Sequence, residues 1–463
     1  MNRRKVLAEL VFFIVLNLAF PLFCFSGEKD FDFSGYNVVF VSFDALQAKH
    51  THSLGYFRKT TPLIDEFAKK GFLFTQAISQ ASWTLPASMS WFTSLYPSEH
   101  KMVNKYSQYS EDKKVFSNLN ELSPDVITLA EILKKAGYAT AAFTGDAGVS
   151  AKFGFGKGFD VYRDEEKFGG FEYSIPLAIQ WISVNRNKKF MIFLHGYDMH
   201  GQYDSPGGYK KIFLDFDYKG KLKGGKEEQG RLREEGLNNG YIDLTDADVR
   251  FWRALYDEKI YDANQRFKVF VDELDKLGLL KKTIIILTSD HGTEFYEHRR
   301  FDHGFSLYDE LIHVPLVIYL PGFKDKKIIQ DQVRSIDLMP TILDLLKIET
   351  KDKVKNQMRG KSLLPLLNGE HMELDAFAET DYRLYAHKRA IRTADGWKFI
   401  YNLDNNKKEL YNLQNDPEEK NNLINQEPRK AYELEQRLLR WLRSMKVDIG
   451  AYKSGKELKI KEY

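Results

Sequence analysis

The sequence predicts an α/β protein in which helices sandwich a large mixed, mostly parallel sheet, followed by a small C-terminal antiparallel sheet plus helix. Strand-like apolar runs recur along most of the chain with helical patterns between them, which indicates crossover connections. After Gly369 this pattern gives way to short alternating runs, which are typical of an antiparallel sheet. The chain has 463 residues and is 43% hydrophobic, which is enough for one large domain and a smaller appendage.

In chain order, the helical patterns of the large domain are expected to cover both faces of its sheet. A helix over 62–70 follows two threonines that can cap it, 126–136 is amphipathic, and 246–277 is a long charged helix with an apolar face. Residues 210–239 are rich in Gly, Lys and Glu and predict an exposed, mobile excursion. The predicted strands are 38–43, 139–144, 190–194, 283–288 and 314–320.

The N-terminus has the order of a secretory signal. Basic residues 3–5 precede a mostly apolar run over 10–25, and charged residues follow. This run is shorter than the roughly 20 apolar residues of a spanning helix, which favours a cleaved signal peptide and a secreted or periplasmic protein. The alternative is an uncleaved segment that anchors the protein to a membrane. The single cysteine, Cys24, lies here and has no second cysteine with which to form an intramolecular disulfide.

The C-terminal part predicts strands over 390–393, 397–401 and 410–413 and a closing helix over 429–445. We therefore expect four parts, namely a signal peptide over 1–26, a main α/β domain over 36–369, a C-terminal subdomain over 370–445 and a charged tail over 446–463. The 68 Lys and Arg residues nearly balance the 65 Asp and Glu, and the formal net charge is +3. Because no overall positive excess is present, we expect no nucleic-acid partner.

Acidic residues follow two of the predicted strands. Asp44 comes directly after 38–43, and Asp290 with His291 comes after 283–288. Because ligands bind beyond the carboxyl ends of the strands in open α/β sheets, both acids can reach one crevice. The alternative for each acid alone is that it caps the turn or helix that follows.

Thr84 lies at the start of another predicted helix. Pro86 stands near that start, and apolar Met89, Phe92 and Leu95 follow at helical spacing. Free backbone N–H groups and the macrodipole at a helix N-terminus stabilise a negatively charged oxygen. Thr84 is therefore a candidate nucleophile or anion contact, and the alternative is a simple N-cap.

These segments resemble the sulfatase branch of the alkaline phosphatase superfamily, from about residue 36 to residue 445. The resemblance rests on residues 37–46, 83–97, 288–316 and 390–417. It implies that Asp44, Thr84, Asp290 and His291 bind one divalent metal ion, with Thr84 also acting as the nucleophile. It further implies that His200, His303 and His195, with His298 ranked last, touch the anionic substrate or protonate the leaving group.

Three residues depart from the family pattern. Classical sulfatases carry a cysteine or serine that is oxidised to formylglycine where this chain has Thr84, an arginine where it has Ser88, and a second metal-binding aspartate where it has Ala45. A threonine carries a methyl branch, so we expect no formylglycine. The chain is in this respect similar to the phosphodiesterase, phosphoethanolamine transferase and lipoteichoic acid synthase branches. The four implied ligands suit zinc or manganese, with calcium or magnesium as alternatives.

The sequence therefore favours an exported, metal-dependent hydrolase or transferase of sulfate or phosphate esters, with phosphate esters favoured by Thr84. The expected substrate is a small-molecule, glycan or lipid-headgroup ester, and membrane contact is expected only if the N-terminal segment stays uncleaved. A formylglycine-independent sulfatase is a further alternative. Because Ala45 and Ser88 occur together, the main alternative is a catalytically inactive sulfatase-like protein that binds an anionic glycan or partner.

Overall fold

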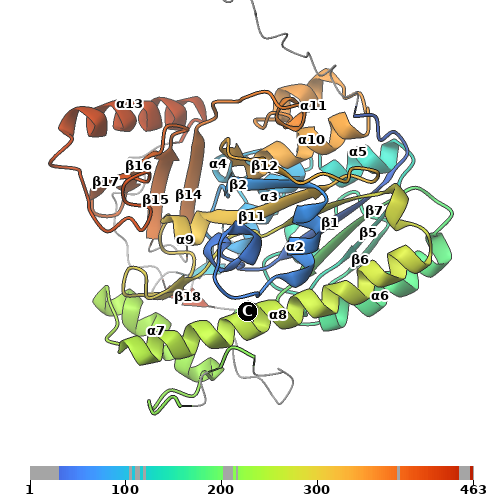
Figure 1. Ribbon diagram of the computed structural model, residues 1–463. Helices are drawn as coiled ribbons and strands as arrows, with labels where there is room; N and C mark the ends of the chain where they lie inside the picture. Colours follow the sequence, from blue (N-terminus) through green and yellow to red (C-terminus); the bar gives the residue numbers. More distant parts are fainter. Residues whose placement is uncertain are drawn as a thin grey trace, which may run out of the picture. The chain divides into compact units, whose positions relative to one another are not determined.

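The main sheet of the computed structural model has nine strands, of which the central ones are parallel (Figure 1). The structure describes residues 31–103, 121–201, 212–214, 217–382 and 386–447, and the backbone of three short strands, β3 (Ser107–Tyr109), β4 (Val115–Ser117) and β18 (Lys459–Lys461). The predicted signal peptide, Cys24 and almost all of the predicted tail lie outside these residues. Every element named below belongs to one unit, Asp32–Tyr463.

The strand order of the main sheet is β12-β2-β11-β8-β1-β7-β5-β6, with β13 beside β2. Strands β8, β1, β7, β5 and β6 are parallel, whereas β11 runs antiparallel to both of its neighbours. The predicted mixed, mostly parallel sheet is therefore confirmed. The bounds are β1 (Asn37–Phe43), β2 (Phe72–Ile78), β5 (Ala139–Phe143), β6 (Val161–Arg163), β7 (Phe190–Gly196), β8 (Thr283–Thr288), β11 (His313–Tyr319), β12 (Lys327–Ile329) and β13 (Val333–Arg334).

Helices cover both faces of this sheet. The helices α2 (Pro62–Lys69), α6 (Phe171–Asn185) and α8 (Asp246–Lys276) share one apolar cluster with the strand residues Val39, Val41 and Leu287. On the other face, α3 (Thr84–Thr93) packs its aromatic side chains against the sheet, and the rings of Phe92 and Phe193 lie 4.9 Å apart. Burial of these apolar faces supplies the main driving force for the layered arrangement. Helices α5 (Leu129–Lys135) and α10 (Leu338–Leu345) lie beside α3.

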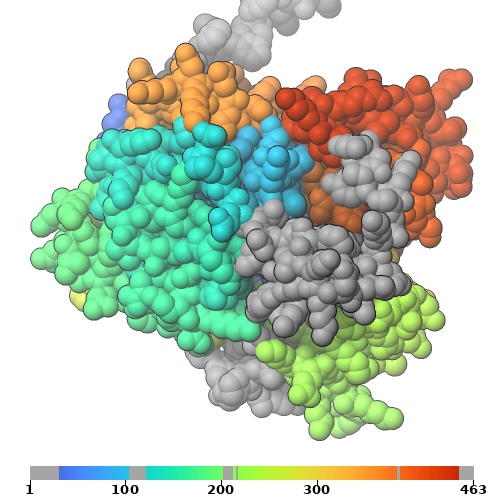
Figure 2. Space-filling view, turned by 180° about the vertical axis from the view of Figure 1, so that it is seen from behind, coloured from blue at the N-terminus to red at the C-terminus, as the bar shows by residue number. Residues whose placement is uncertain are grey.

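A four-stranded antiparallel sheet forms the C-terminal part, as predicted. Its strands are β14 (Ala376–Tyr382), β15 (Ala386–Arg392), β16 (Trp397–Asn402) and β17 (Lys408–Asn412), and α13 (Pro428–Ser444) packs on one face. The other face packs on residues of the large domain such as Leu307 and Leu311. Seen from behind in Figure 2, this part, coloured orange to red, lies on the side away from residues 121–170, coloured teal.

The second half of the predicted exposed excursion over 210–239 forms a helix that the sequence did not predict, α7 (Lys226–Asn239), and most of its positions are exposed or half-buried. Few of its residues are apolar, so its periodicity is weak, yet Leu232 is buried in the main cluster. The sequence analysis also missed β14 and four strands of the main sheet, namely β2, β6, β12 and β13. No helix among the described residues is both long enough and apolar enough to cross a bilayer.

Candidate metal and catalytic site

Three neighbouring strands end at the candidate site. Asp44 follows β1, which lies between β7 and β8 in the sheet. Ser42 of β1 lies opposite His195 of β7 on one side and opposite Thr288 of β8 on the other. Asp290 and His291 follow β8 after Ser289, so the parallel register brings all of these side chains to the same edge of the sheet, as predicted from the strand ends.

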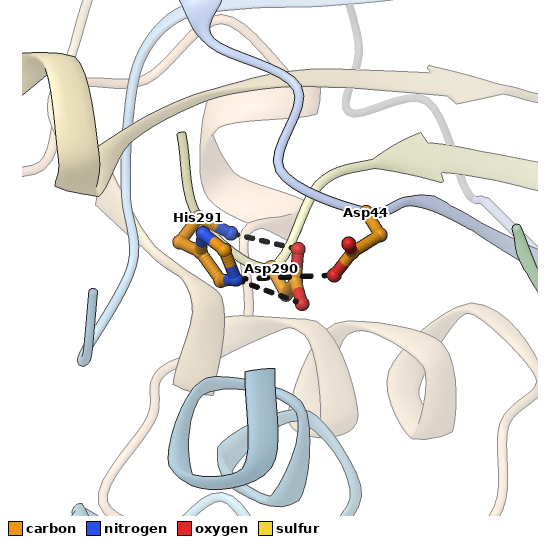
Figure 3. A group of neighbouring side chains, drawn as sticks. All are labelled: Asp44, Asp290 and His291. Carbon is orange, nitrogen blue, oxygen red and sulfur yellow. Dashed lines mark hydrogen bonds and ion pairs between the residues drawn. The ribbon is translucent and has the colours of Figure 1, made fainter. Parts of the chain in front are cut away.

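Asp44, Asp290 and His291 form a buried cluster whose ligand atoms all lie within 4.8 Å of one another (Figure 3). The Nε2 atom of His291 lies 3.8 Å from Oδ1 of Asp44 and 3.5 Å from Oδ2 of Asp290. These separations exceed those of direct hydrogen bonds, and they approach the roughly 3.3–3.5 Å expected between two ligands that bind one zinc-sized ion at about 2.0–2.1 Å with tetrahedral angles. The spacing therefore suits donors gathered around a cation.

Thr84 joins this cluster from the N-terminus of α3. Its Oγ1 donates to Oδ1 of Asp44 at 3.2 Å and lies 3.2 Å from Nε2 of His291. Trp83 occupies the N-cap position and Thr84 is the first helical residue. The alternative that Thr84 is an N-cap is therefore wrong, because its hydroxyl contacts the cluster and Trp83 stands at the N-cap position.

Backbone and hydroxyl donors hold the Asp290 segment in place. Oδ1 of Asp290 accepts from its own neighbour, the N–H of His291, at 2.9 Å, and from the N–H of Ala45 at 3.1 Å. The Ser79 hydroxyl donates to the Asp290 carbonyl at 2.5 Å. One carboxylate oxygen is thus engaged by the backbone, while Oδ2 is buried and accepts no hydrogen bond from the described residues.

The charge of the cluster is suited to a divalent cation. Burial raises the pKa of Asp290, but the adjacent His291 and His195 outweigh burial and lower it to about 2. Burial also lowers the pKa of His291 to about 4, although Asp290 opposes this shift. At neutral pH Asp290 is therefore a carboxylate and His291 a neutral imidazole, which are the protonation states that metal ligands require.

The three remaining predicted histidines lie around this cluster. Nε2 of His195 lies 3.7 Å from Oδ1 of Asp44, and burial lowers the pKa of His195 to about 4. The ring of His303 lies 4.4 Å from that of His291, and the ring of His200 lies 5.2 Å from that of His303. His195 thus lies beside Asp44, and His303 and His200 extend the site outward from His291.

His298, ranked last among the histidines, belongs to a different group. Its Nδ1 lies 2.7 Å from Oε1 of Glu310, and its Nε2 lies 3.1 Å from the carbonyl oxygen of Glu419. It therefore links the large domain to the C-terminal part. Both of its ring nitrogens are engaged in these contacts.

Sequence reasoning missed two residues that organise His303. Oδ1 of Asp302 lies 2.6 Å from Nδ1 of His303, which orients the ring and leaves Nε2 as the nitrogen that can contact a ligand. The guanidinium of Arg233, in α7, lies 3.4 Å from the same carboxylate. The Asp302-His303 dipeptide was a visible signal of an Asp–His pair, whereas Arg233 lay within the predicted excursion and carried none.

Aromatic residues border the site from two directions. The ring of Tyr382, at the end of β14, lies 5.6 Å from that of Trp83 and 6.5 Å from that of His303. Gly304 follows His303 with a φ of +95°, and a Cβ there would come within 2.6 Å of the Tyr382 ring. The C-terminal sheet therefore contributes a wall to the candidate site, which the sequence did not indicate.

Comparison with known families gives two matches to this chain. The family described as "Sulfatase" matches residues 36–348, and the family described as "N-sulphoglucosamine sulphohydrolase, C-terminal" matches residues 296–448. Arylsulfatase K of Gallus gallus is 25% identical over 372 residues, which cover 72% of this chain and 66% of that protein. Arylsulfatase K of Mus musculus is 24% identical over 380 residues, which cover 74% of this chain and 65% of that protein. The match thus spans slightly less than two thirds of these relatives.

Solved structures share the fold at low sequence identity. The phosphonate monoester hydrolase of Agrobacterium radiobacter has a TM-score of 0.70 at 18% identity, covering 89% of this chain and 96% of that chain. A protein solved in complex with its substrate D-glucosamine-2-N,6-O-disulfate has a TM-score of 0.67 at 19% identity. The match covers 89% of this chain and 98% of that chain. The fold is therefore found in proteins named for phosphonate and for sulfate substrates.

Proposed function

Because this chain belongs to the sulfatase family, we propose that it is a metal-dependent hydrolase of sulfate or phosphate esters that uses Thr84 as its nucleophile. The convergence of Thr84, Asp44 and His291 within 3.2–3.8 Å carries this proposal. A family member that only bound an anion would have no need of a hydroxyl and three metal donors at one point. Ser88, which stands where classical sulfatases have an arginine, is buried in α3.

Asp44, Asp290, His291 and Thr84 would hold the divalent ion. When bound, such an ion favours the alkoxide form of a hydroxyl and withdraws charge from the ester oxygens. The donor set of three oxygens and one nitrogen fits zinc or manganese, with calcium or magnesium as alternatives. A buried, acidic site of this kind also excludes water from the reacting groups.

The chain's own residues then account for a two-step hydrolysis. The Thr84 hydroxyl, which donates to Asp44 in this structure, would lose its proton to solvent when the ion binds, and its Oγ1 then attacks the phosphorus or sulfur atom. The bond from the phosphorus or sulfur atom to the ester oxygen breaks, and a histidine on the outer side donates a proton to that oxygen. This histidine is either His303, which Asp302 holds, or His200. A water molecule then attacks the phosphorus or sulfur atom of the threonine ester, its bond to Thr84 Oγ1 breaks, phosphate or sulfate leaves, and a proton of the water restores the hydroxyl.

Phosphate esters are the favoured substrates in this proposal, because the methyl branch of Thr84 prevents the oxidation on which classical sulfatases rely. The sugar disulfate seen in a structural neighbour supports a glycan ester as one substrate class, beside small-molecule and lipid-headgroup esters. A transferase would replace the water with an acceptor alcohol. We further propose export to the periplasm or the outside, supported by the basic and apolar N-terminal segment.

The test uses aryl phosphate mono- and diesters and an aryl sulfate, with and without Zn²⁺ or Mn²⁺. We expect metal-dependent turnover with higher kcat/KM on a phosphate ester, and a loss on the order of 10³-fold or more in Thr84→Ala. Thr84→Ser keeps a hydroxyl and should retain activity. Thr93→Ala, at the other end of the same helix, removes a buried hydroxyl that bonds Met89 and serves as the control.

Mass spectrometry gives a sharper readout of the same proposal. Rapid quenching with a phosphodiester should yield a phosphorylated peptide that contains Thr84. Absence of turnover on all three ester classes, together with no metal retained, would instead favour the inactive binding protein.

A further inference from the structure

The residue after Asp44 has an unusual backbone conformation. Ala45 has a φ of +58° and is 1% exposed. This left-handed region is unfavourable for residues with a Cβ and favours glycine. A buried alanine held there needs support from the surrounding structure.

The left-handed turn at Ala45 serves the candidate metal site. It directs the N–H of Ala45 to Oδ1 of Asp290, at 3.1 Å, and the N–H of Leu46 to the hydroxyl of Ser289, at 2.9 Å. The segment after β1 is thereby joined to the segment after β8. Relaxation of Ala45 toward ordinary φ values would turn its N–H away from Asp290 and change the direction in which Asp44 leaves its strand.

One hydroxyl spans this turn. The Tyr256 hydroxyl donates to the carbonyl oxygen of Ala45 at 2.6 Å and accepts from the N–H of Gln47 at 2.9 Å. Tyr256 lies in the middle of α8 and is fully buried, with its ring 4.6 Å from that of Phe295. Burial raises the pKa of Tyr256 well above its usual range, so the hydroxyl keeps the proton that it donates.

We propose that Tyr256 is a positioning residue that clamps Ala45 in the left-handed conformation and so sets the separation of the Asp44 and Asp290 carboxylates for a divalent cation. The inference rests on the proposed function, because it assumes that these acids bind a metal. It assigns a role toward the candidate site to α8, whose sequence lies about 200 residues from Asp44 in the chain and whose apolar face packs into the core. Groups that orient metal ligands in this way typically contribute about 10–100-fold to metal affinity.

The test is a double-mutant cycle on the full chain, read out as the dissociation constant of Zn²⁺ or Mn²⁺ alone by titration calorimetry. Tyr256→Phe should weaken binding about 10–100-fold, since it removes only the hydroxyl. The glycine in Ala45→Gly adopts a positive φ without support from Tyr256. In that background, the loss of metal affinity caused by Tyr256→Phe should therefore fall to about threefold or less. Tyr308→Phe is the control, because its hydroxyl bonds Glu409 in the C-terminal part.

Each outcome decides between the proposals. Unchanged affinity in Tyr256→Phe, or a loss that Ala45→Gly leaves undiminished, would overturn the clamp while the metal site stands. Absence of metal binding by the wild-type chain would instead overturn the proposed function. If Tyr256→Phe fails to fold, folding of the double variant supports the clamp, and its failure to fold contradicts it.

Discussion

Gly148 sets the space available to the proposed nucleophile. A Cβ at this position would come within 2.6 Å of the Thr84 Cβ and within 2.8 Å of its methyl group. Such contacts are shorter than real side chains allow, so an added methyl must displace Thr84. The absence of a side chain at Gly148 is therefore part of the geometry of the site.

We expect Gly148→Ala to lower kcat by about 10²-fold, since a displacement of about 1 Å of a reacting group has an effect of this size. Gly156→Ala is the matched control, because a Cβ there meets Ala151 at an ordinary 3.4 Å and lies in the same part of the chain. Steady-state kinetics on the best aryl phosphate and far-UV circular dichroism check this. Unaltered kcat in Gly148→Ala would show that Thr84 tolerates the displacement.

At the scale of residues, the sequence predicts those site residues that stand at the ends of strands and helices. It predicts fewer of the site residues whose role depends on contacts between distant parts of the chain. Asp44, Asp290 and Thr84 were identified because each stands at the terminus of a recognisable element. Tyr256 carries no such signal, since a tyrosine on the apolar face of a long helix is ordinarily core. Its hydroxyl acquires a role only when α8 packs over the β1 end.

At the scale of elements, the β9–β10 hairpin carries His303 to the site. β9 (Glu294–Phe295) pairs with β10 (Phe301–Asp302), and Oε1 of Glu294 accepts from the N–H groups of His298 and Arg300 inside the loop. Burial, aided by the carboxylates of Glu310 and Glu297, raises the pKa of Glu294 to about 7. The hairpin therefore holds a carboxyl group that is readily protonated near neutral pH.

This shift predicts a pH dependence of stability. The folded pKa lies above the unfolded value near 4.5, so the folded protein retains a proton that the unfolded chain releases between these values. The free energy of unfolding should therefore fall as the pH rises from about 4.5 to 7, by at most about 1.4 kcal/mol per pH unit from this group. Glu294→Gln should lack this contribution.

Urea unfolding of the wild type and Glu294→Gln at pH 5, 6 and 7 measures this difference. The variant should gain stability relative to the wild type as the pH rises. Glu227→Gln, on an exposed position of α7, is the control and should follow the wild type. A constant difference between Glu294→Gln and the wild type at all three pH values would contradict the shift.

The elements that the sequence predicted share strong patterns, and those that it missed lack them. β1 and β8 are continuous apolar runs buried on both faces, and α8 has a long helical period. β14 was missed because its sequence, AFAETDY, includes two acids that are nearly buried by packing and ion pairing, such as Glu379 with Arg389. α7 was missed because its few buried positions include a glycine and a glutamine.

At the scale of the whole molecule, a buried charge cluster joins the two sheets. Asp309 of the large domain accepts from Lys398 at 2.8 Å and from Arg392 at 3.1 Å, both on C-terminal strands. Burial opposes ionisation of Asp309, but these two cations outweigh it and lower its pKa well below the usual range. The C-terminal part is therefore attached by charge pairing in addition to the apolar contacts of Leu307 and Leu311.

Asp309→Asn should lower the free energy of unfolding by about 3–5 kcal/mol, because it removes the carboxylate that pairs with buried Arg392 and leaves buried Lys398 with Glu419 alone. Guanidinium unfolding at pH 7 measures the change. Asp160→Asn, which breaks the exposed pair with Lys134, should cost less than about 1 kcal/mol and is the control. Equal effects of the two substitutions would show that Asp309 contributes no more than a surface pair.

The central position of β1 between β7 and β8 has a consequence for the order of events during folding. Residues near 44, 195 and 290 enter the sheet from widely separated parts of the chain, and such non-local pairings form slowly. An isolated fragment holding only one of these strands has an incomplete set of the proposed metal donors. Capture of a cation by a refolding chain should therefore occur late and can serve as a signal that the central strands have come together.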